Sequence, residues 1–108
     1  MAAFGGSPAT CGQQVSIAYG TFLTDGKALP DKAGKDKPLT FRIGEGKVMP
    51  ALEMGVVGMK EGGTRNLLAP PNMSYGIKAF AHPGMPDTVS VRFAIDLLSV
   101  KPPLPDLD

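Results

Sequence analysis

The stretch from Val48 to Gly76, VMPALEMGVVGMKEGGTRNLLAPPNMSYG, decides the fold of this chain. Its apolar positions Leu52, Val56 and Met59 are separated by four and three residues, which is the spacing of one helix face. Pro50 suits the first helical turn, where its missing N–H is not needed. Glycines follow Met59 and end the pattern. We therefore predict a short helix of about two turns.

The second half of this stretch predicts a strand and then a loop. Residues 63–71 are extended in character and close on two prolines. Residues 70–88 form one long irregular segment that contains Tyr75. Loops longer than about 12–15 residues in a compact domain are usually functional or disordered. We therefore expect a functional loop here and treat Tyr75 as a loop residue that adds little to the core.

Three other segments alternate apolar and polar residues, as half-buried strands do. They are residues 13–26, 39–44 and 88–100. The last of them is the most regular, and its alternation begins at Val89. Several antiparallel strands and one helix predict an α+β domain, in which the helix covers one face of a twisted sheet.

Composition restricts the function further. The chain has 108 residues and a net charge of +1, so it has the size of one domain and lacks the basic character of nucleic-acid-binding proteins. It has no apolar run of membrane-spanning length. Cys11 is the only cysteine, so an intrachain disulfide is excluded. We expect no nucleic-acid or membrane partner and a monomer. The cytoplasm is favoured, and export stays open because a leader could have been removed.

Composition also suggests the domain limits. Residues 1–11 are small and glycine-rich and are expected to form a flexible tail, and residues 101–108 form a proline-rich tail. The folded domain is expected to span residues 12–100.

The residues that could move protons or bind metal do not form an evident cluster in the sequence, and the carboxylates Glu45, Glu53 and Glu61 are dispersed. His82 is the only histidine, and it precedes Pro83 in the long loop. One histidine and one cysteine cannot supply the roughly four ligands of a zinc site, and no phosphate-binding glycine motif is present. We therefore predict no metal and no cofactor, and a Cys-dependent or metal enzyme is only a distant alternative.

Rotation about an X–Pro peptide bond is a reaction that needs none of these groups. Its barrier of about 18–20 kcal/mol comes from amide resonance. The twisted transition state loses the charge separation of that resonance, so an apolar pocket favours it over water. The cis and trans forms differ by only about 0.5–1 kcal/mol, so no energy source is required.

Three blocks of the sequence resemble the FKBP-type peptidyl-prolyl cis–trans isomerases. They are VSIAYGTFLTDGKAL, PLTFRIGEGKVMPALEMGVVGMKEGGTRNLLAPPNMSYG and HPGMPDTVSVRFAIDLLSV. The resemblance covers residues 12–100. It implies a five- or six-stranded antiparallel sheet wrapped around one short helix, with an apolar proline pocket between them.

The resemblance also implies the site residues. Tyr75, Tyr19 and Phe93 match the residues expected to act in catalysis, and the Tyr75 hydroxyl is expected to donate to a ligand carbonyl. Nine further residues match positions expected to bind substrate: Val48, Met49, Leu52, Leu29, Leu39, Asp31, His82, Met85 and Phe41. Of these, Val48 and Met49 lead into the helix, where a backbone N–H can still donate.

Several pocket positions depart from the family pattern. Leu52 replaces a frequent Trp, and Leu29 and Leu39 replace frequent Phe residues. The pocket Asp of the family falls on Pro30, so that Asp31 comes one residue late, which leaves its pairing with Tyr75 open.

Two functions therefore stay open from the sequence. The first is a prolyl isomerase of reduced activity that acts on proline-containing peptides and unfolded protein clients and binds macrolides of the rapamycin type weakly. The alternative is a non-catalytic or chaperone-like module of the same fold that binds proline segments or unfolded chain. The retained aromatic residues favour the first, and the aliphatic replacements favour the second.

Overall fold

The computed structural model describes residues 8–81 and 83–101. The elements follow the order β1 (Gln14–Leu23), β2 (Leu39–Arg42), α1 (Pro50–Val56), β3 (Thr64–Ala69), the 3₁₀ turns η1 (Pro71–Met73) and η2 (Lys78–Phe80), and β4 (Val91–Lys101). This confirms the predicted α+β class, with one short helix among antiparallel strands.

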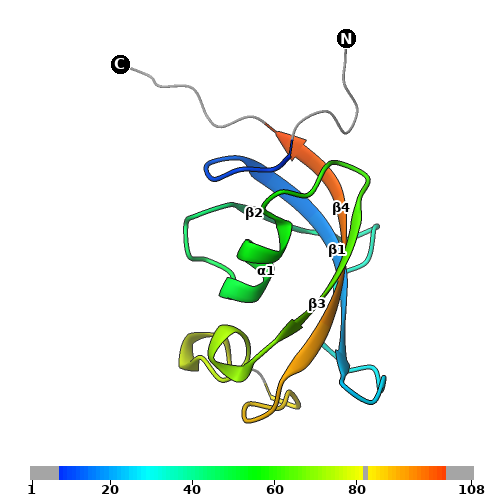
Figure 1. Cartoon of the computed structure of the whole chain (residues 1–108), viewed down its shortest axis with the longest axis vertical. Helices are drawn as coiled ribbons and strands as arrows, with labels where there is room; N and C mark the ends of the chain where they lie inside the picture. Colours follow the sequence, from blue (N-terminus) through cyan, green and yellow to red (C-terminus); the bar gives the residue numbers. More distant parts are fainter. Residues whose placement is uncertain (1–7, 82, 102–108) are drawn as a thin grey trace.

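The four strands form one antiparallel sheet in the order β2-β1-β4-β3. The long strands β1 and β4 lie at its centre, and α1 packs on one face of the twisted sheet (Figure 1). The count of four in the described residues is lower than the five or six that the resemblance implied. The segment that returns along β1 forms only isolated bridges, Tyr19 with Ala33 and Phe22 with Ala28. It is therefore not a continuous strand.

Helix α1 begins at Pro50, as predicted, and ends after seven residues. Glu53 holds the loop before it, because its Oε2 accepts the backbone amides of Gly44 at 2.9 Å and Gly46 at 3.1 Å. In the described part of the chain, no helix has the length and apolar character needed to span a membrane.

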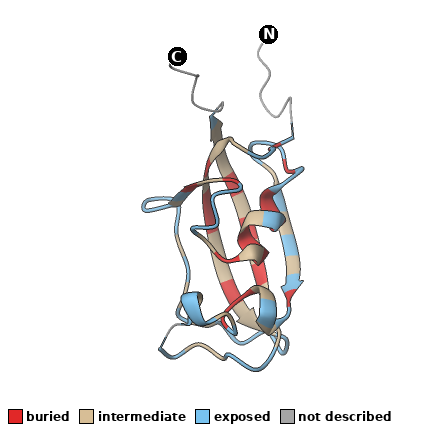
Figure 2. Cartoon of the chain, turned by 90° about the vertical axis from the view of Figure 1, so that its left-hand side faces the viewer, coloured by how far each residue is buried: buried red, intermediate tan, exposed pale blue. Residues whose placement is uncertain are grey.

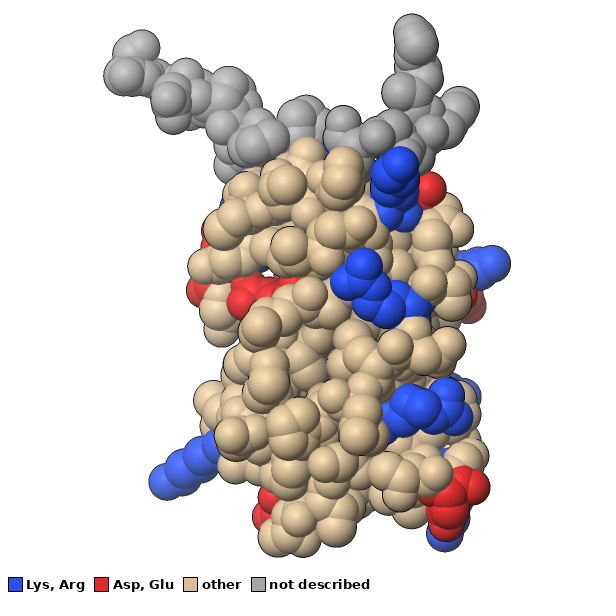
Figure 3. Space-filling model, viewed as in Figure 1, with Lys and Arg blue, Asp and Glu red and all other residues tan. Residues whose placement is uncertain are grey.

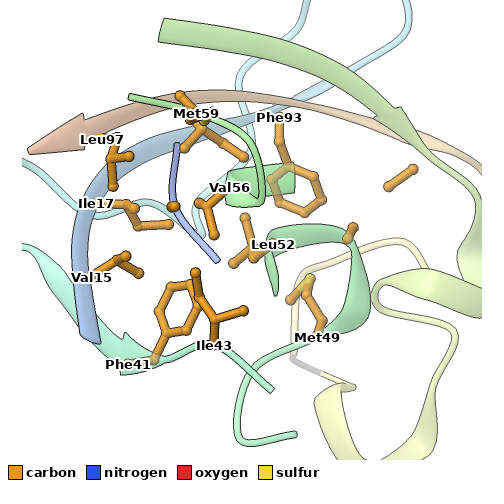
Figure 4. Close-up of a cluster of buried hydrophobic side chains, with 14 of the residues drawn as sticks. Val15, Ile17, Phe41, Ile43, Met49, Leu52, Val56, Met59, Phe93 and Leu97 are labelled. Atoms are coloured by element: carbon orange, nitrogen blue, oxygen red, sulfur yellow. The ribbon is translucent and has the colours of Figure 1, made fainter. Parts of the chain in front are cut away.

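The core lies between α1 and the sheet. Leu52 and Val56 point from the helix toward Val15, Ile17 and other apolar strand residues (Figure 4). Figure 2 shows the same arrangement as buried residues on the inner face of the strands and along the helix. Leu52 is 1% exposed and Val56 is fully buried, so the helical spacing read from the sequence marks the buried face.

The start of the last strand differs from the prediction. Strand β4 begins at Val91 rather than at Val89. Val89 is 47% exposed, although its apolar character fits the alternation. The segment before Val91 is a bend that belongs to the preceding loop. The alternation of apolar and polar residues in the sequence therefore extends beyond the hydrogen-bonded strand.

Candidate functional site

Two tyrosines and one carboxylate form a hydrogen-bonded cluster. The Tyr19 hydroxyl donates to Oδ1 of Asp31 at 2.9 Å, and the Tyr75 hydroxyl donates to Oδ2 of the same side chain. Tyr19 comes from β1, Tyr75 from the turn after η1, and Asp31 from the segment that returns along β1. The three groups lie far apart in the sequence and are brought together only by the fold.

Phe93 forms the apolar side of this cluster. Its ring centroid lies 6.1 Å from that of Tyr19 in an edge arrangement with an interplanar angle of 67°. The Tyr75 ring is also 6.1 Å away and is tilted by 41°. Phe93 is fully buried and points from β4 toward the helix that carries Leu52 (Figure 4). Of the three residues expected to act in catalysis, Phe93 therefore packs against both Tyr19 and Tyr75.

The sequence PPNMSYG positions Tyr75. The Ser74 hydroxyl donates to the Pro70 carbonyl at 3.0 Å, and the Ser74 amide donates to the Pro71 carbonyl at 3.1 Å. Residue 76 is a glycine, and its backbone passes very close to Pro71 and Asp87, which leaves no room for a side chain. A Cβ at Gly76 would lie 2.6 Å from the Pro71 carbonyl oxygen. The turn is thus fixed on both sides of Tyr75.

The expectation that Tyr75 adds little to the core is wrong. Its side chain is 1% exposed and belongs to the main hydrophobic cluster. Burial, then the hydrogen bond to Asp31 and its negative charge, raise the pKa of Tyr75 far above the usual phenol value, and the contact with Thr21 opposes them. Burial and the Asp31 charge and hydrogen bond also raise the pKa of Tyr19. Both hydroxyls therefore keep their protons at neutral pH.

The late position of Asp31 does not remove its pairing with Tyr75. Asp31 lies within an irregular stretch of the segment that returns along β1, and its carboxylate accepts hydrogen bonds from both tyrosines. The position-by-position comparison with the family placed its Asp on Pro30, one residue before Asp31.

The other predicted substrate-binding residues divide by burial. Leu52, Met49 and Phe41 are buried in the core. Four others are partly buried against the same core, namely Leu29, Leu39, Val48 and Met85. His82 lies outside the described residues. Within the described residues no group accepts a hydrogen bond from the Met49 amide.

Two surface hollows adjoin these elements. One of about 480 Å³ is bounded by Leu39, Phe41 and Val48 together with polar residues of β2 and the following loop. The other, of about 250 Å³, lies between α1 and β3 and includes Met54 and Leu68. Figure 3 shows that most of the surface over α1 is uncharged. The second hollow contains none of the predicted site residues.

Sequence reasoning missed Thr21, which belongs to the hydrogen-bonded cluster. Thr21 is 1% exposed, its hydroxyl donates to the main-chain carbonyl of Asp31 at 2.7 Å, and its oxygen lies 3.3 Å from the Tyr75 hydroxyl. The signal was present in the alternation of β1. Thr21 continues the face of Val15, Ile17 and Tyr19, and a polar residue on a buried face needs a hydrogen-bond partner.

The family follows from comparison with known proteins. The family model described as FKBP-type peptidyl-prolyl cis-trans isomerase matches residues 5–98. The chain belongs to this family.

Individual relatives agree with this assignment. FK506-binding protein 4 of Aspergillus oryzae is 40% identical over 96 residues, which are 89% of this chain and 20% of that protein. FK506-binding protein 4 of Chaetomium thermophilum is 41% identical over 90 residues, covering 83% of this chain and 18% of that protein. The chain thus spans about a fifth of the length of these relatives.

A solved structure supports the fold directly. The structure of FkpA from Escherichia coli superposes with a TM-score of 0.71 at 34% sequence identity, and the match covers 89% of this chain and 43% of that chain.

Proposed function

We propose that residues 12–100 form a prolyl isomerase domain that accelerates X–Pro rotation in peptides and unfolded protein clients, at a lower rate than aromatic-lined family members. The observation that carries this proposal is the cluster in which Tyr19 and Tyr75 share the Asp31 carboxylate beside Phe93. Membership of the isomerase family supports the reaction class.

The chemistry needs only desolvation and hydrogen-bond donors. Apolar side chains around Phe93 remove water from a bound X–Pro amide, which weakens the charge separation of its planar form. The Tyr75 hydroxyl and the Met49 amide are the donors that we propose for the substrate, and the hydroxyl would bind the carbonyl that turns. Each decrease of about 1.4 kcal/mol in the barrier accelerates rotation tenfold.

Two features account for a reduced rate. First, Leu52, Leu29 and Leu39 keep the site apolar but provide no flat ring beneath a proline. Second, Tyr75 already donates to a carboxylate, and a hydrogen bond to a charged group contributes about 1.5–3 kcal/mol. A substrate carbonyl has to compete with Asp31 for this proton. We expect the same competition to weaken the binding of rapamycin-type macrolides.

Magnetisation exchange between the cis and trans forms of a Leu-Pro peptide tests the proposal. The protein should accelerate this exchange in proportion to its concentration, and Tyr75→Phe should reduce the acceleration. Met54→Ala is the matched control, because Met54 is 62% exposed on α1 and is not a member of the hydrogen-bonded cluster. Absence of acceleration at high protein concentration would exclude the isomerase.

The second candidate is a binding module of the same fold that holds proline segments or unfolded chain without rotating them. The aliphatic residues at positions 29, 39 and 52 favour it. Chemical-shift changes on addition of the same peptide, without faster exchange between its isomers, would identify this function. We also propose that the protein is a monomer, so the same experiment should show no self-association.

A further inference from the structure

The segment after β1 returns along the same strand with an irregular register. The Leu29 amide donates to the Thr21 carbonyl at 2.8 Å, and Tyr19 and Ala33 exchange two backbone hydrogen bonds of 2.8 and 2.9 Å. Between these pairs, residues 30–32 of the returning segment face Gly20 alone. The returning segment therefore bulges at this point, and Asp31 lies at the centre of the bulge.

The Thr21 side chain spans this bulge. Its Oγ1 donates to the Asp31 carbonyl at 2.7 Å, so it anchors the main chain of the residue whose carboxylate binds both phenols. Its 3.3 Å approach to the Tyr75 hydroxyl is the weaker contact. Each hydroxyl carries a single proton. The Thr21 proton is used by the Asp31 carbonyl and the Tyr75 proton by the Asp31 carboxylate.

We propose that Thr21 is a positioning residue, which fixes the Asp31 carboxylate against Tyr19 and Tyr75 by anchoring the bulged main chain. Thr21 does not contact the substrate and acts through Asp31. The consequence for catalysis rests on the proposed isomerase function, whereas the positioning itself does not.

The two possible roles of Thr21 have opposite signatures in tyrosine ionisation. As a direct neighbour of Tyr75, Thr21 lowers the pKa of that phenol, while Asp31 raises it. If Thr21 acted only by direct contact, its removal would raise the pKa of Tyr75 further. If Thr21 positions Asp31, its removal weakens the effect of the carboxylate on both phenols and lowers their pKa. Within the described residues, Asp31 and Tyr19 are the charged or titratable groups that act on Tyr75.

The chain is well suited to this measurement, because it has two tyrosines and no tryptophan. Tyrosinate absorbance in an alkaline titration therefore reports only Tyr19 and Tyr75, and far-UV circular dichroism on the same samples reports unfolding. In the wild-type protein we expect ionisation to coincide with alkaline unfolding. In Thr21→Val, which keeps the side-chain shape and removes the hydroxyl, part of the ionisation should precede unfolding.

Conservative and control variants distinguish positioning from packing. Thr21→Ser keeps the hydroxyl and should restore the wild-type titration. Thr24→Val, on the exposed turn of the same hairpin, should change nothing. In an Asp31→Asn background, Thr21→Val should add no further change. If Thr21→Val does not fold, Thr21→Cys replaces it, since a thiol is a weak donor.

The decisive result is the order of the two transitions. Early ionisation in Thr21→Val, reversed in Thr21→Ser, supports the proposal. Ionisation that still coincides with unfolding, or that is delayed beyond the wild type, overturns it. Peptide exchange gives the catalytic arm: Thr21→Val should reduce acceleration about two- to tenfold, as the loss of one hydrogen bond does. If the wild type gives no acceleration, the proposed function fails, but the titration still decides the role of Thr21.

Discussion

The space between α1 and the sheet holds two kinds of packing. Around Leu52, Val56 and Val15, the side chains are apolar and mostly aliphatic, with the Phe41 ring among them, and they meet by shape alone (Figure 4). Around Tyr75 and Asp31, aromatic rings are held by hydrogen bonds of fixed direction. The first region, the aliphatic core, stabilises the domain in proportion to the volume that it fills. The second region, the tyrosine–aspartate cluster, holds a few atoms in fixed positions, as a site requires.

Removal of volume from the aliphatic core should give the largest effect. Leu52→Ala should decrease the free energy of unfolding by about 2–5 kcal/mol, because Leu52 is almost fully buried and the cavity cannot collapse completely. Denaturant titration measures this loss, and Met54→Ala on the exposed side of the same helix should stay within about 0.5 kcal/mol of the wild type. Equal losses in the two variants would contradict the assignment of the buried face.

Removal of the Tyr75 hydroxyl should give the second-largest effect. Tyr75→Phe leaves Oδ2 of the partly buried Asp31 carboxylate without its phenol donor, and a hydrogen bond to a charged group contributes about 1.5–3 kcal/mol. The variant should therefore lose both stability and catalysed exchange, and denaturant titration with peptide exchange measures the two. Unchanged stability would mean that Tyr75 behaves as the loop residue that the sequence suggested.

The two regions differ in how well the sequence predicts them, because one depends on interactions between residues close in sequence and the other on interactions between distant residues. The aliphatic core depends on local spacing, so Leu52, Val56 and the start of α1 at Pro50 were all predictable. The cluster depends on how residues 30–32 bulge against Gly20, which is a matter of tertiary register. Asp31 was therefore named as a candidate while its pairing stayed open, and Thr21 was missed. The same irregular register is the reason that the returning segment is not a further strand.

The two regions should also respond differently to pH. Burial and Asp31 raise the folded-state pKa of Tyr75 and Tyr19 above the value near 10 of an unfolded phenol. The protonated phenols therefore contribute stability that is fully present below about pH 10 and is lost as pH rises toward the folded-state pKa values. Thermal unfolding across this range should show a decline that is shallower in Tyr75→Phe. An identical decline in both proteins would assign the effect to other groups, such as the lysines.

Removal of the Tyr19 hydroxyl should give the smallest loss of stability, and this variant distinguishes the contributions of the two phenol donors in the cluster. Tyr19 is only partly buried, so water can replace its hydroxyl at Asp31 more easily than it can replace that of Tyr75. Tyr19→Phe should therefore cost about 0.5–1.5 kcal/mol, the net contribution of one ordinary hydrogen bond. Because both phenols bind one carboxylate, the double variant should depart from additivity by about 0.5 kcal/mol or more. Denaturant titration of the two single variants and the double variant completes the cycle. Strict additivity would mean that the phenols bind Asp31 independently, and the cluster would then be two separate hydrogen bonds rather than one coupled unit.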